Sequence, residues 1–250
     1  MARPSPPHPV LKRYYETEHD RESFVTALFD GAARHYERIG QILDLGSGPT
    51  YRRYALVRAG LRPGMKLLDV ATGTGLMARG GRRVVGAAGR VVGIDPSRGM
   101  LGEARKALAG SLVQGRAEAL PFRDAQFDML SMCFALRHVA DLEVAFREYR
   151  RVLKPGGRLL LVEVSRPESA TTRWLIRVYF QRVLPRIMRI STGNRPAELL
   201  MKYFWDTIDQ CVPPEVILEV ARASGFTAAR RRVFAGFLSE YVGVKGDSRP

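Results

Sequence analysis

Two aspartates that each end a short apolar run are the side chains of this sequence best placed to bind a ligand. Asp69 ends the first run, and a turn of small residues with two glycines follows at 71–75. Asp95 ends the second run. At the carboxyl edge of a parallel sheet, glycines let the backbone approach a ligand, and the second acid accepts hydrogen bonds from a ribose diol. The spacing therefore predicts a site for a nucleotide-like cofactor at Asp69–Gly75 and Asp95.

A similar segment lies upstream, at Asp44–Gly48, and it precedes Asp69 by nearly the interval that separates Asp69 from Asp95. Only two apolar residues lead into Asp44, which is too few for a central strand. Pro49 also interrupts the turn that would follow. We therefore interpret Asp69–Gly75 as the cofactor loop and the upstream segment as a coincidence.

The composition favours a cytoplasmic protein with one large core. The chain has 250 residues, of which 46% are hydrophobic, enough for one core with a small cap. Its two cysteines, Cys133 and Cys211, form neither a metal-type spacing nor a disulfide framework. No uncharged run is long enough to span a membrane, and the start lacks a signal peptide's apolar stretch. His8 and His19 give no ligand pattern, so we expect no metal.

The formal net charge of +15 predicts attraction to anionic surfaces. The basic residues are mostly arginines scattered through every segment, and no basic block with interleaved aromatics indicates a nucleic-acid strip. We therefore expect no nucleic-acid partner. Two explanations stay open: a genome-wide bias in composition, or a specific anionic partner, which could be an acidic substrate or a membrane surface such as the inner face of the cell membrane.

The apolar spacing changes its period along the chain, and this change predicts the fold. A proline-rich lead, 1–12, is expected to be disordered, and helical periodicity covers 13–64. From 65 to 165 strands and helices alternate. Strands are expected at 66–71, 90–95, 111–114, 127–134 and 158–164, and helices at 76–85, 96–108 and 141–153. This alternation predicts a doubly wound, Rossmann-like α/β fold with a mostly parallel sheet.

Residues 166–212 interrupt the alternation with an amphipathic helical insertion in which arginines separate apolar residues. The insertion is expected to be a cap packed on the sheet domain, a lid over an apolar substrate that touches a membrane, or both. Between 213 and 250, a last helix precedes two strand-like runs, 226–234 and 236–242. These runs predict an antiparallel C-terminal hairpin that completes a seven-stranded sheet.

Three further motifs follow the loop and Asp95 in order, at Gln114–Phe122, Phe127–Leu130 and Val152–Gly157. Together they resemble the class I S-adenosylmethionine-dependent methyltransferases over 65–165. Leu76 follows Gly75 directly, where a dinucleotide-binding loop would continue to a third glycine that helps to hold a pyrophosphate. S-adenosylmethionine has no phosphate, so the resemblance implies that cofactor rather than NAD.

Four more segments are similar to the ubiquinone/menaquinone C-methyltransferase family, from about residue 29 to 243. They are Phe29–Tyr36, Phe134–Val139, Val183–Ile187 and Tyr203–Ile208. The resemblance implies an enzyme that methylates a ring carbon of a prenylated hydroquinone. Two alternatives stay open: an O- or N-methyltransferase of a secondary metabolite or lipid, and a non-catalytic cofactor-binding paralogue. A homodimer is compatible with each.

The resemblance also implies roles for single residues. The methionine part of the cofactor would be lined by Gly73, Thr74 and Gly75, and its ribose hydroxyls would be held by Asp95. The adenine would be bordered by Arg116 and Ala117, and Cys133 would lie under the cofactor. Asp69 would orient the loop. Arg137 would face the substrate ring and stabilise a phenolate, His138 would be a base or proton shuttle, and Tyr36 and Tyr203 would pack against the substrate.

Several of these residues have simpler explanations or depart from the family. Arg137 could pair with Asp141 or Glu143, and His138 could be a hydrogen-bonded loop residue. The two tyrosines could belong to the core. The family usually has Asn or Asp where Arg116 stands, and a guanidinium group offers the adenine amine no acceptor. Three more positions depart from the family: Cys133 stands where the family has Ser, His138 where it has Asn, and Leu76 where it has an acid. These departures bear on the identity of the methyl acceptor more than on the use of the cofactor.

Overall fold

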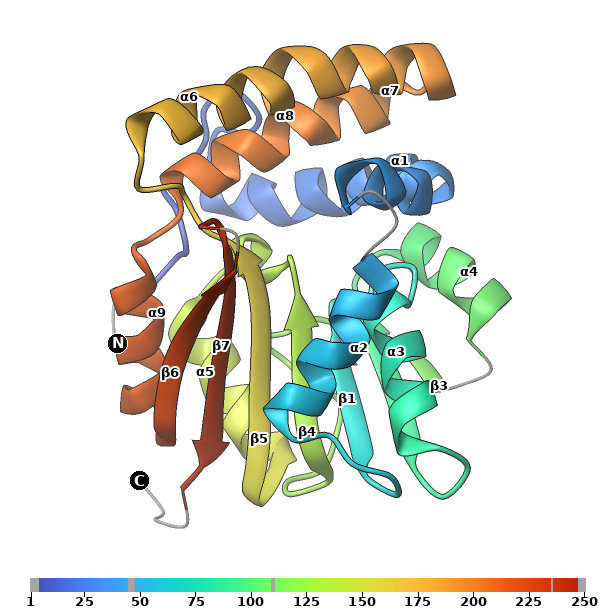
Figure 1. Ribbon diagram of the computed structural model, residues 1–250, viewed down its shortest axis with the longest axis vertical. Helices are drawn as coiled ribbons and strands as arrows, with labels where there is room; N and C mark the ends of the chain where they lie inside the picture. Colours follow the sequence, from blue (N-terminus) through green and yellow to red (C-terminus); the bar gives the residue numbers. More distant parts are fainter. Residues whose placement is uncertain (1–4, 45–47, 109–110, 235, 247–250) are drawn as a thin grey trace.

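The computed structural model describes residues 5–44, 48–108, 111–234 and 236–246. Its centre is a seven-stranded sheet in the order β3-β2-β1-β4-β5-β7-β6 (Figure 1). The strands are β1 (Lys66–Val70), β2 (Arg90–Asp95), β3 (Ser111–Gln114), β4 (Phe127–Cys133), β5 (Leu153–Val164), β6 (Phe226–Phe234) and β7 (Leu238–Lys245). The first five are parallel, and β7 runs antiparallel to β5 and β6. The predicted doubly wound fold and C-terminal hairpin are confirmed.

Helices cover both faces of the sheet (Figure 1). One face carries α2 (Gly48–Ala59), α3 (Leu76–Val85) and α4 (Arg98–Ala107), and the other carries α5 (Leu142–Val152) and α9 (Pro214–Ala223). Successive strand residues supply the two cores, since Leu67 packs with the α2–α3 side and Leu68 with the α5–α9 side. Burial on both faces explains why these strands read as continuous apolar runs.

A third layer of helices lies over the carboxyl ends of the parallel strands (Figure 1). It consists of α1 (Glu18–Asp44), α6 (Ala170–Val178), the π-helical turn η2 (Tyr179–Val183), α7 (Leu184–Thr192) and α8 (Arg195–Gln210). These helices pack around their own core, in which Leu28, Leu184, Met188 and Leu200 are buried. Within the described ranges, no helix is long and apolar enough to cross a bilayer.

The proline-rich lead differs from the expected disorder. The carbonyl of Ser5 accepts a hydrogen bond from the Leu142 amide at 2.9 Å, and that of Pro7 accepts one from Val212 at 2.7 Å. His8 and Leu11 are buried. Prolines lack the amide donor but keep the carbonyl acceptor. The lead can therefore be held against the neighbouring segments through its carbonyls, without forming a helix or strand. Residues 1–4 of the lead lie outside the described residues.

Two segments differ from a simple reading of the sequence. The strand expected at 158–164 begins earlier, at Leu153, so Lys154–Gly157 lies inside β5, where the β4–β5 register shifts before Met129 pairs with Arg158. The upstream look-alike of the cofactor loop does not follow a strand. Asp44 ends α1 and Gly48 begins α2, and 45–47 lie outside the described residues.

Candidate functional site

A cavity of about 560 Å³ lies at the carboxyl ends of the central strands. Strand β1 has β2 on one side and β4 on the other, so the chain reverses its winding direction here. Open α/β sheets bind ligands at this kind of switch point. The wall combines the loops after β1, β2, β3 and β4 with α1, through Gly73, Asp95, Arg116, Ala117, Cys133, Phe134, His138, Phe29 and Tyr36.

The loop after β1 brings backbone, rather than side chain, to the cavity. Gly73 has φ +56°, and a Cβ atom added there would meet nothing within 4 Å. Its side of the loop is therefore open to a ligand. The Gly73 amide donates to Asp95 Oδ2 at 2.8 Å, which ties the two predicted cofactor residues together. Gly75 has φ +85° at the start of α3, a backbone conformation that favours glycine.

Asp69 holds this loop from below and does not line the cavity. Its two carboxylate oxygens accept hydrogen bonds from the hydroxyls of Thr72 and Ser131, each at 2.7 Å. Burial raises the pKa of Asp69 to about 6, although these hydroxyl bonds oppose the shift. The Thr74 hydroxyl is buried without a partner in the described structure, and neither Thr74 nor Gly75 lines the cavity. These three residues therefore shape the loop.

Asp95 fits the role of a ribose ligand. Oδ1 accepts the Ser97 amide at 2.9 Å and Oδ2 accepts the Gly73 amide. A carboxylate offers about four lone-pair positions, so two remain for a ribose diol. Burial raises the pKa of Asp95 to about 6, and the two amide bonds oppose that shift. The carboxylate is thus fixed in place and still able to accept hydrogen bonds.

The expected adenine end has an apolar wall and an acidic rim. Pro96, Met100 and Ala117 supply the apolar side. Arg116 donates to Glu22 at 2.5 Å and lies 3.7 Å from Glu118, so its guanidinium group is engaged at the rim. Glu118 also lines the cavity and can supply the acceptor that Arg116 lacks.

His138 faces the cavity from the loop after β4. It ends the short 3-10 helix η1 (Leu136–His138), and both of its ring nitrogens are buried without a partner in the described structure. The ring stacks on Tyr203 at 5.5 Å between centroids and meets Phe29 edge-on at 5.3 Å. Burial lowers its pKa well below the usual value, and the Arg137 charge adds to this shift. The ring is therefore neutral, with one donor and one acceptor.

Arg137 does not line the cavity, contrary to its expected contact with the substrate ring. Its guanidinium group forms a buried ion pair with Glu163 at the end of β5. Its Nε atom donates to the Thr207 hydroxyl at 3.1 Å. A buried guanidinium group requires an opposite charge and hydrogen bonds, and these partners draw it toward β5 and α8. Within the described residues, Arg137 pairs with neither Asp141, which instead caps α5, nor Glu143.

The remaining predicted residues divide between the cavity and the core. Tyr36 lines the cavity, and burial raises its pKa to about 12. Cys133 lines it at the end of β4, and burial raises the pKa of its thiol to about 12, so the thiol stays protonated. Tyr203 lies behind His138 in the third core and does not line the cavity. Its contact with a substrate is therefore indirect.

Phe29, Met100 and Met132 are wall residues that we did not assign to the site from sequence. Phe29 begins one of the family-like segments, so its position was the available signal. No comparable pattern marks the two methionines. Within the described ranges, no group of three His, Cys, Asp or Glu side chains could hold a metal ion.

Comparisons with known proteins identify relatives of this chain. Residues 16–245 match the family described as the ubiE/COQ5 methyltransferase family. The chain is 38% identical over 234 residues to the ubiquinone/menaquinone biosynthesis C-methyltransferase UbiE of Hahella chejuensis, covering 90% of this chain and 93% of that protein. It is 33% identical over 236 residues to the demethylmenaquinone methyltransferase of Symbiobacterium thermophilum, covering 90% and 94%.

Solved structures support the fold. An S-adenosylmethionine-dependent methyltransferase from Aquifex aeolicus superposes with a TM-score of 0.60 at 18% identity, covering 84% of this chain and 97% of that one. A possible histamine N-methyltransferase from Thermotoga maritima gives 0.62 at 22% identity, covering 88% and 99%. These identities bear on the fold alone.

Proposed function

Because this chain belongs to the ubiE/COQ5 methyltransferase family and is an S-adenosylmethionine-dependent methyltransferase, we propose that it methylates a ring carbon of a prenylated hydroquinone in ubiquinone or menaquinone synthesis. One observation carries this proposal. The cavity that contains Asp95 and Gly73 also has a wall of Phe29, Tyr36 and His138. Aromatic side chains pack well against a planar ring, so one cavity can hold the cofactor and the acceptor together.

The cofactor end needs to bind and orient rather than to catalyse. When bound, S-adenosylmethionine supplies a methyl group that its sulfonium charge already activates. Asp95 would hold the ribose and the Gly73 backbone would adjoin the methionine part. Cys133, at the end of β4, would lie beneath. Fixing the ring carbon in line with the methyl group then supplies much of the rate, since orientation converts an encounter into an intramolecular step.

His138 is our candidate for the group that accepts the phenolic proton. Its ring is neutral, and one nitrogen carries a lone pair that no described residue occupies. A phenol hydroxyl placed in the cavity can donate to that nitrogen. Proton transfer makes the ring carbon nucleophilic, and the phenolate that forms beside the imidazolium offsets the cost of charging a buried histidine.

Arg137 is assigned a positioning role. Its ion pair with Glu163 and its hydrogen bond to Thr207 fasten η1 to β5 and α8. The same short helix presents His138 to the cavity. The Arg137 charge also opposes the rise in the pKa of Tyr36, so it favours negative charge in the cavity from outside the wall.

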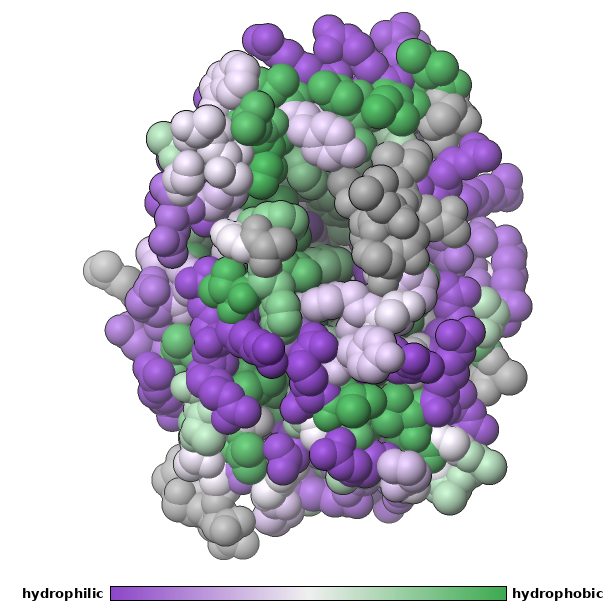
Figure 2. Space-filling view, viewed as in Figure 1, coloured by the Kyte–Doolittle hydropathy of each residue, from purple (hydrophilic) through white to green (hydrophobic). Residues whose placement is uncertain are grey.

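The outer face of α6–α7 is our candidate for contact with a membrane. Trp174, Leu175 and Ile190 are 61%, 55% and 86% exposed, whereas Leu184 and Met188 face inward and are buried. Arginines 173, 177, 182, 186 and 189 lie between the apolar side chains. Figure 2 shows hydrophobic and hydrophilic side chains side by side along the upper edge, over α6 and α7. This combination suits the interface of an anionic bilayer, where a prenylated substrate would reside.

Methyl transfer with a labelled cofactor tests the proposed reaction. The purified protein is given S-adenosylmethionine with a deuterated methyl group and a reduced demethylmenaquinone, and the product is analysed by fragmentation mass spectrometry. We expect the label on a ring carbon. Label on an oxygen, or transfer only to an unrelated amine or hydroxyl acceptor, would support the O- or N-methyltransferase alternative. Cofactor binding without transfer would support the non-catalytic paralogue.

A further inference from the structure

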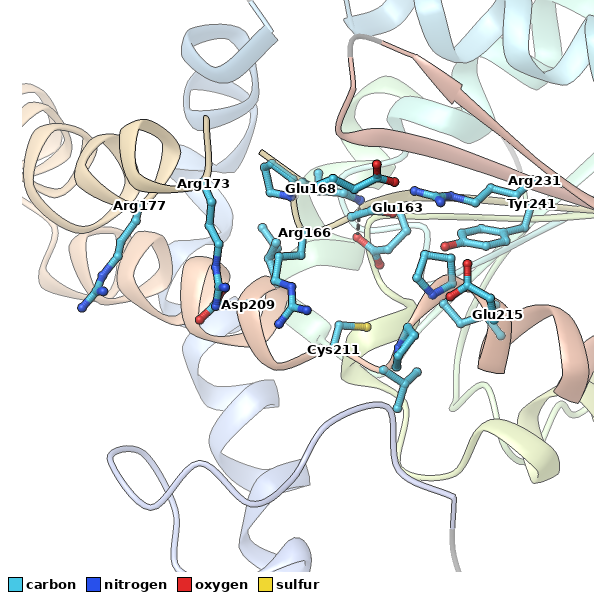
Figure 3. Close-up of a pocket in the computed structure, with 18 of the residues that line it drawn as sticks. Glu163, Arg166, Glu168, Arg173, Arg177, Asp209, Cys211, Glu215, Arg231 and Tyr241 are labelled. Atoms are coloured by element: carbon cyan, nitrogen blue, oxygen red, sulfur yellow. Dashed lines mark hydrogen bonds and ion pairs between the residues drawn. The ribbon is translucent and has the colours of Figure 1, made fainter. Parts of the chain in front are cut away.

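A second cavity, of about 670 Å³, lies between the end of β5, α6 and the start of α9 (Figure 3). It shares no described lining residue with the cofactor cavity, and the proposed methyl transfer does not use it. Its charged lining residues are Arg166, Arg173, Arg177, Arg231, Glu163, Glu168, Asp209 and Glu215. A cavity of this size with both charge signs in its wall is suited to a polar ligand.

Glu163 gives this cavity a buried acceptor. One oxygen, Oε1, accepts hydrogen bonds from Arg137 and from the Val164 amide. The other, Oε2, is buried and accepts no well-directed hydrogen bond in the described structure, although the Leu136 and Arg137 amides face the carboxylate. An unsatisfied buried oxygen costs free energy. Because Glu163 lines the cavity, a ligand there can supply the missing donor.

Both charge signs occur at each end of the cavity. Figure 3 shows Arg166, Arg173 and Arg177 on the α6 side with Asp209 beside Arg173, and Glu163, Glu215 and Arg231 toward Tyr241. Arg173 already pairs with Asp209 at 2.6 Å. Arg166 makes no ion pair within the described residues and can bind an anionic group. Guanidinium groups suit phosphate oxygens because they donate in a planar fork.

We propose that this cavity binds a phosphate ester that carries a primary ammonium group. The phosphate would lie at the Arg166 wall, and the ammonium would donate to Glu163 Oε2 and Glu215. A primary ammonium has three donors, whereas a quaternary one has none. Arg173, Trp174 and Arg177 belong both to this cavity and to α6, so we assign the headgroup of an aminophospholipid as the source. That assignment rests on the membrane contact proposed above, but headgroup binding does not.

Calorimetry with soluble headgroups tests the site. The full-length protein is titrated with glycerophosphoethanolamine, glycerophosphocholine and inorganic phosphate. We expect one site for the first compound and at least about tenfold weaker binding of the other two. Arg166→Ala and Glu215→Gln should each weaken binding at least about tenfold. Arg123→Ala removes an exposed arginine outside the cavity and should leave binding unchanged. Glu163→Gln does not serve as a test of the site, because this substitution also breaks the ion pair with Arg137.

Each other result overturns a defined part of the proposal. No binding of glycerophosphoethanolamine, or equal binding of inorganic phosphate, overturns the two-charge site. Equal binding of glycerophosphocholine overturns the role of Glu163 and Glu215. If the soluble headgroup binds but phosphatidylethanolamine in phosphatidylcholine vesicles recruits no more protein than phosphatidylcholine alone, the lipid source is wrong. If the protein binds glycerophosphoethanolamine but transfers no methyl group in the labelled-cofactor assay, only the proposed reaction is contradicted.

Discussion

The Arg137 guanidinium group and the Glu163 carboxylate form a buried ion pair in which each side chain is only 2% exposed. The pair joins the loop after β4 to the end of β5. The Arg137 charge lowers the pKa of Glu163, and burial raises it more strongly. Neither charge has a favourable environment without the other, so the loss of either one alone should destabilise the native state.

Removing one member of this pair should destabilise the protein more than removing both. We expect Arg137→Met to lower the free energy of unfolding by about 3–5 kcal/mol, because a buried carboxylate is left without its partner. Arg137→Met combined with Glu163→Met should recover much of that loss. Urea unfolding followed by circular dichroism measures both.

The control is Arg116→Ala, which breaks a pair whose two side chains are 44% and 51% exposed. Exposed pairs contribute about 0–1 kcal/mol. Equal destabilisation by Arg116→Ala and Arg137→Met would contradict the importance of burial.

Asp95→Ala should weaken S-adenosylmethionine binding by at least about tenfold. The substitution removes an acceptor for the ribose, and each hydrogen bond to a charged group contributes about 1.5–3 kcal/mol. It also releases the Gly73 amide from its partner. Isothermal calorimetry gives the affinity, and Asp124→Ala serves as a control because that side chain is 77% exposed outside the cavity. Unchanged affinity in Asp95→Ala would remove Asp95 from the cofactor site.

The loop and the alternation of strands with helices could be read from sequence because they depend on neighbours in the chain. Gly73 follows β1, Asp95 ends β2, and the two strands pair in parallel, so the proximity of these residues follows from the topology. The direction of the Arg137 side chain could not be predicted, since it depends on Glu163 in β5 and Thr207 in α8. Both partners are brought near only by folding.

The order of the N-terminal lead was equally hidden. Its composition is typical of disorder, and its fixed position depends on amides that α5 and the segment before α9 leave available. Similarly, Phe29 and Met100 reach the cavity only because α1 packs against α4 over the strand ends. Sequence periodicity identifies such residues as buried, but does not tell which buried surface they face.

His138→Ala should lower kcat by about 10²–10⁴-fold if the imidazole accepts the phenolic proton. Cofactor affinity should change little, because the assigned ribose and loop contacts involve Asp95 and Gly73. Methyl transfer under saturating cofactor measures kcat, and calorimetry measures the affinity. The matched substitution is His35→Ala, since His35 does not line the cavity. Full activity in His138→Ala would make this histidine an aromatic wall residue only.

His8 should make the native state less stable as the pH falls from about 6.5 to about 4. Burial and the neighbouring Arg21 charge lower its pKa from 6.5 to about 4. In this window the unfolded state binds a proton that the native state excludes, so acid favours unfolding. The full effect is on the order of 3 kcal/mol, from about 1.4 kcal/mol per pKa unit.

The difference between the wild type and His8→Asn isolates this effect. Asp69 and Asp95 have raised pKa values of about 6, and raised carboxyl pKa values give the opposite trend in both proteins. Urea unfolding at pH 7 and pH 5 measures the free energy of unfolding. Its decrease between pH 7 and pH 5 should be smaller for His8→Asn than for the wild type. His19→Asn, at an exposed position, should behave as the wild type does. If the free energy of unfolding decreases equally in His8→Asn and the wild type, His8 does not cause the acid destabilisation.

The outer face of α6–α7 should be required for membrane binding but not for folding. Trp174→Asp with Ile190→Asp places charges on two strongly exposed positions. We expect at least about tenfold weaker co-sedimentation with vesicles that contain phosphatidylglycerol, because apolar insertion and attraction to anionic lipid act together. The unfolding midpoint in urea should be nearly unchanged, since surface substitutions usually alter stability by about 0.5 kcal/mol or less.

Val233→Asp is the matched control, because Val233 is 44% exposed on β6 rather than on the α6–α7 face. It should bind vesicles as the wild type does. The test also separates a membrane from a second copy of the chain as the occupant of this face. If the face joins two copies, light scattering will show a dimer that Trp174→Asp with Ile190→Asp converts to monomer, and vesicle binding will not depend on these residues.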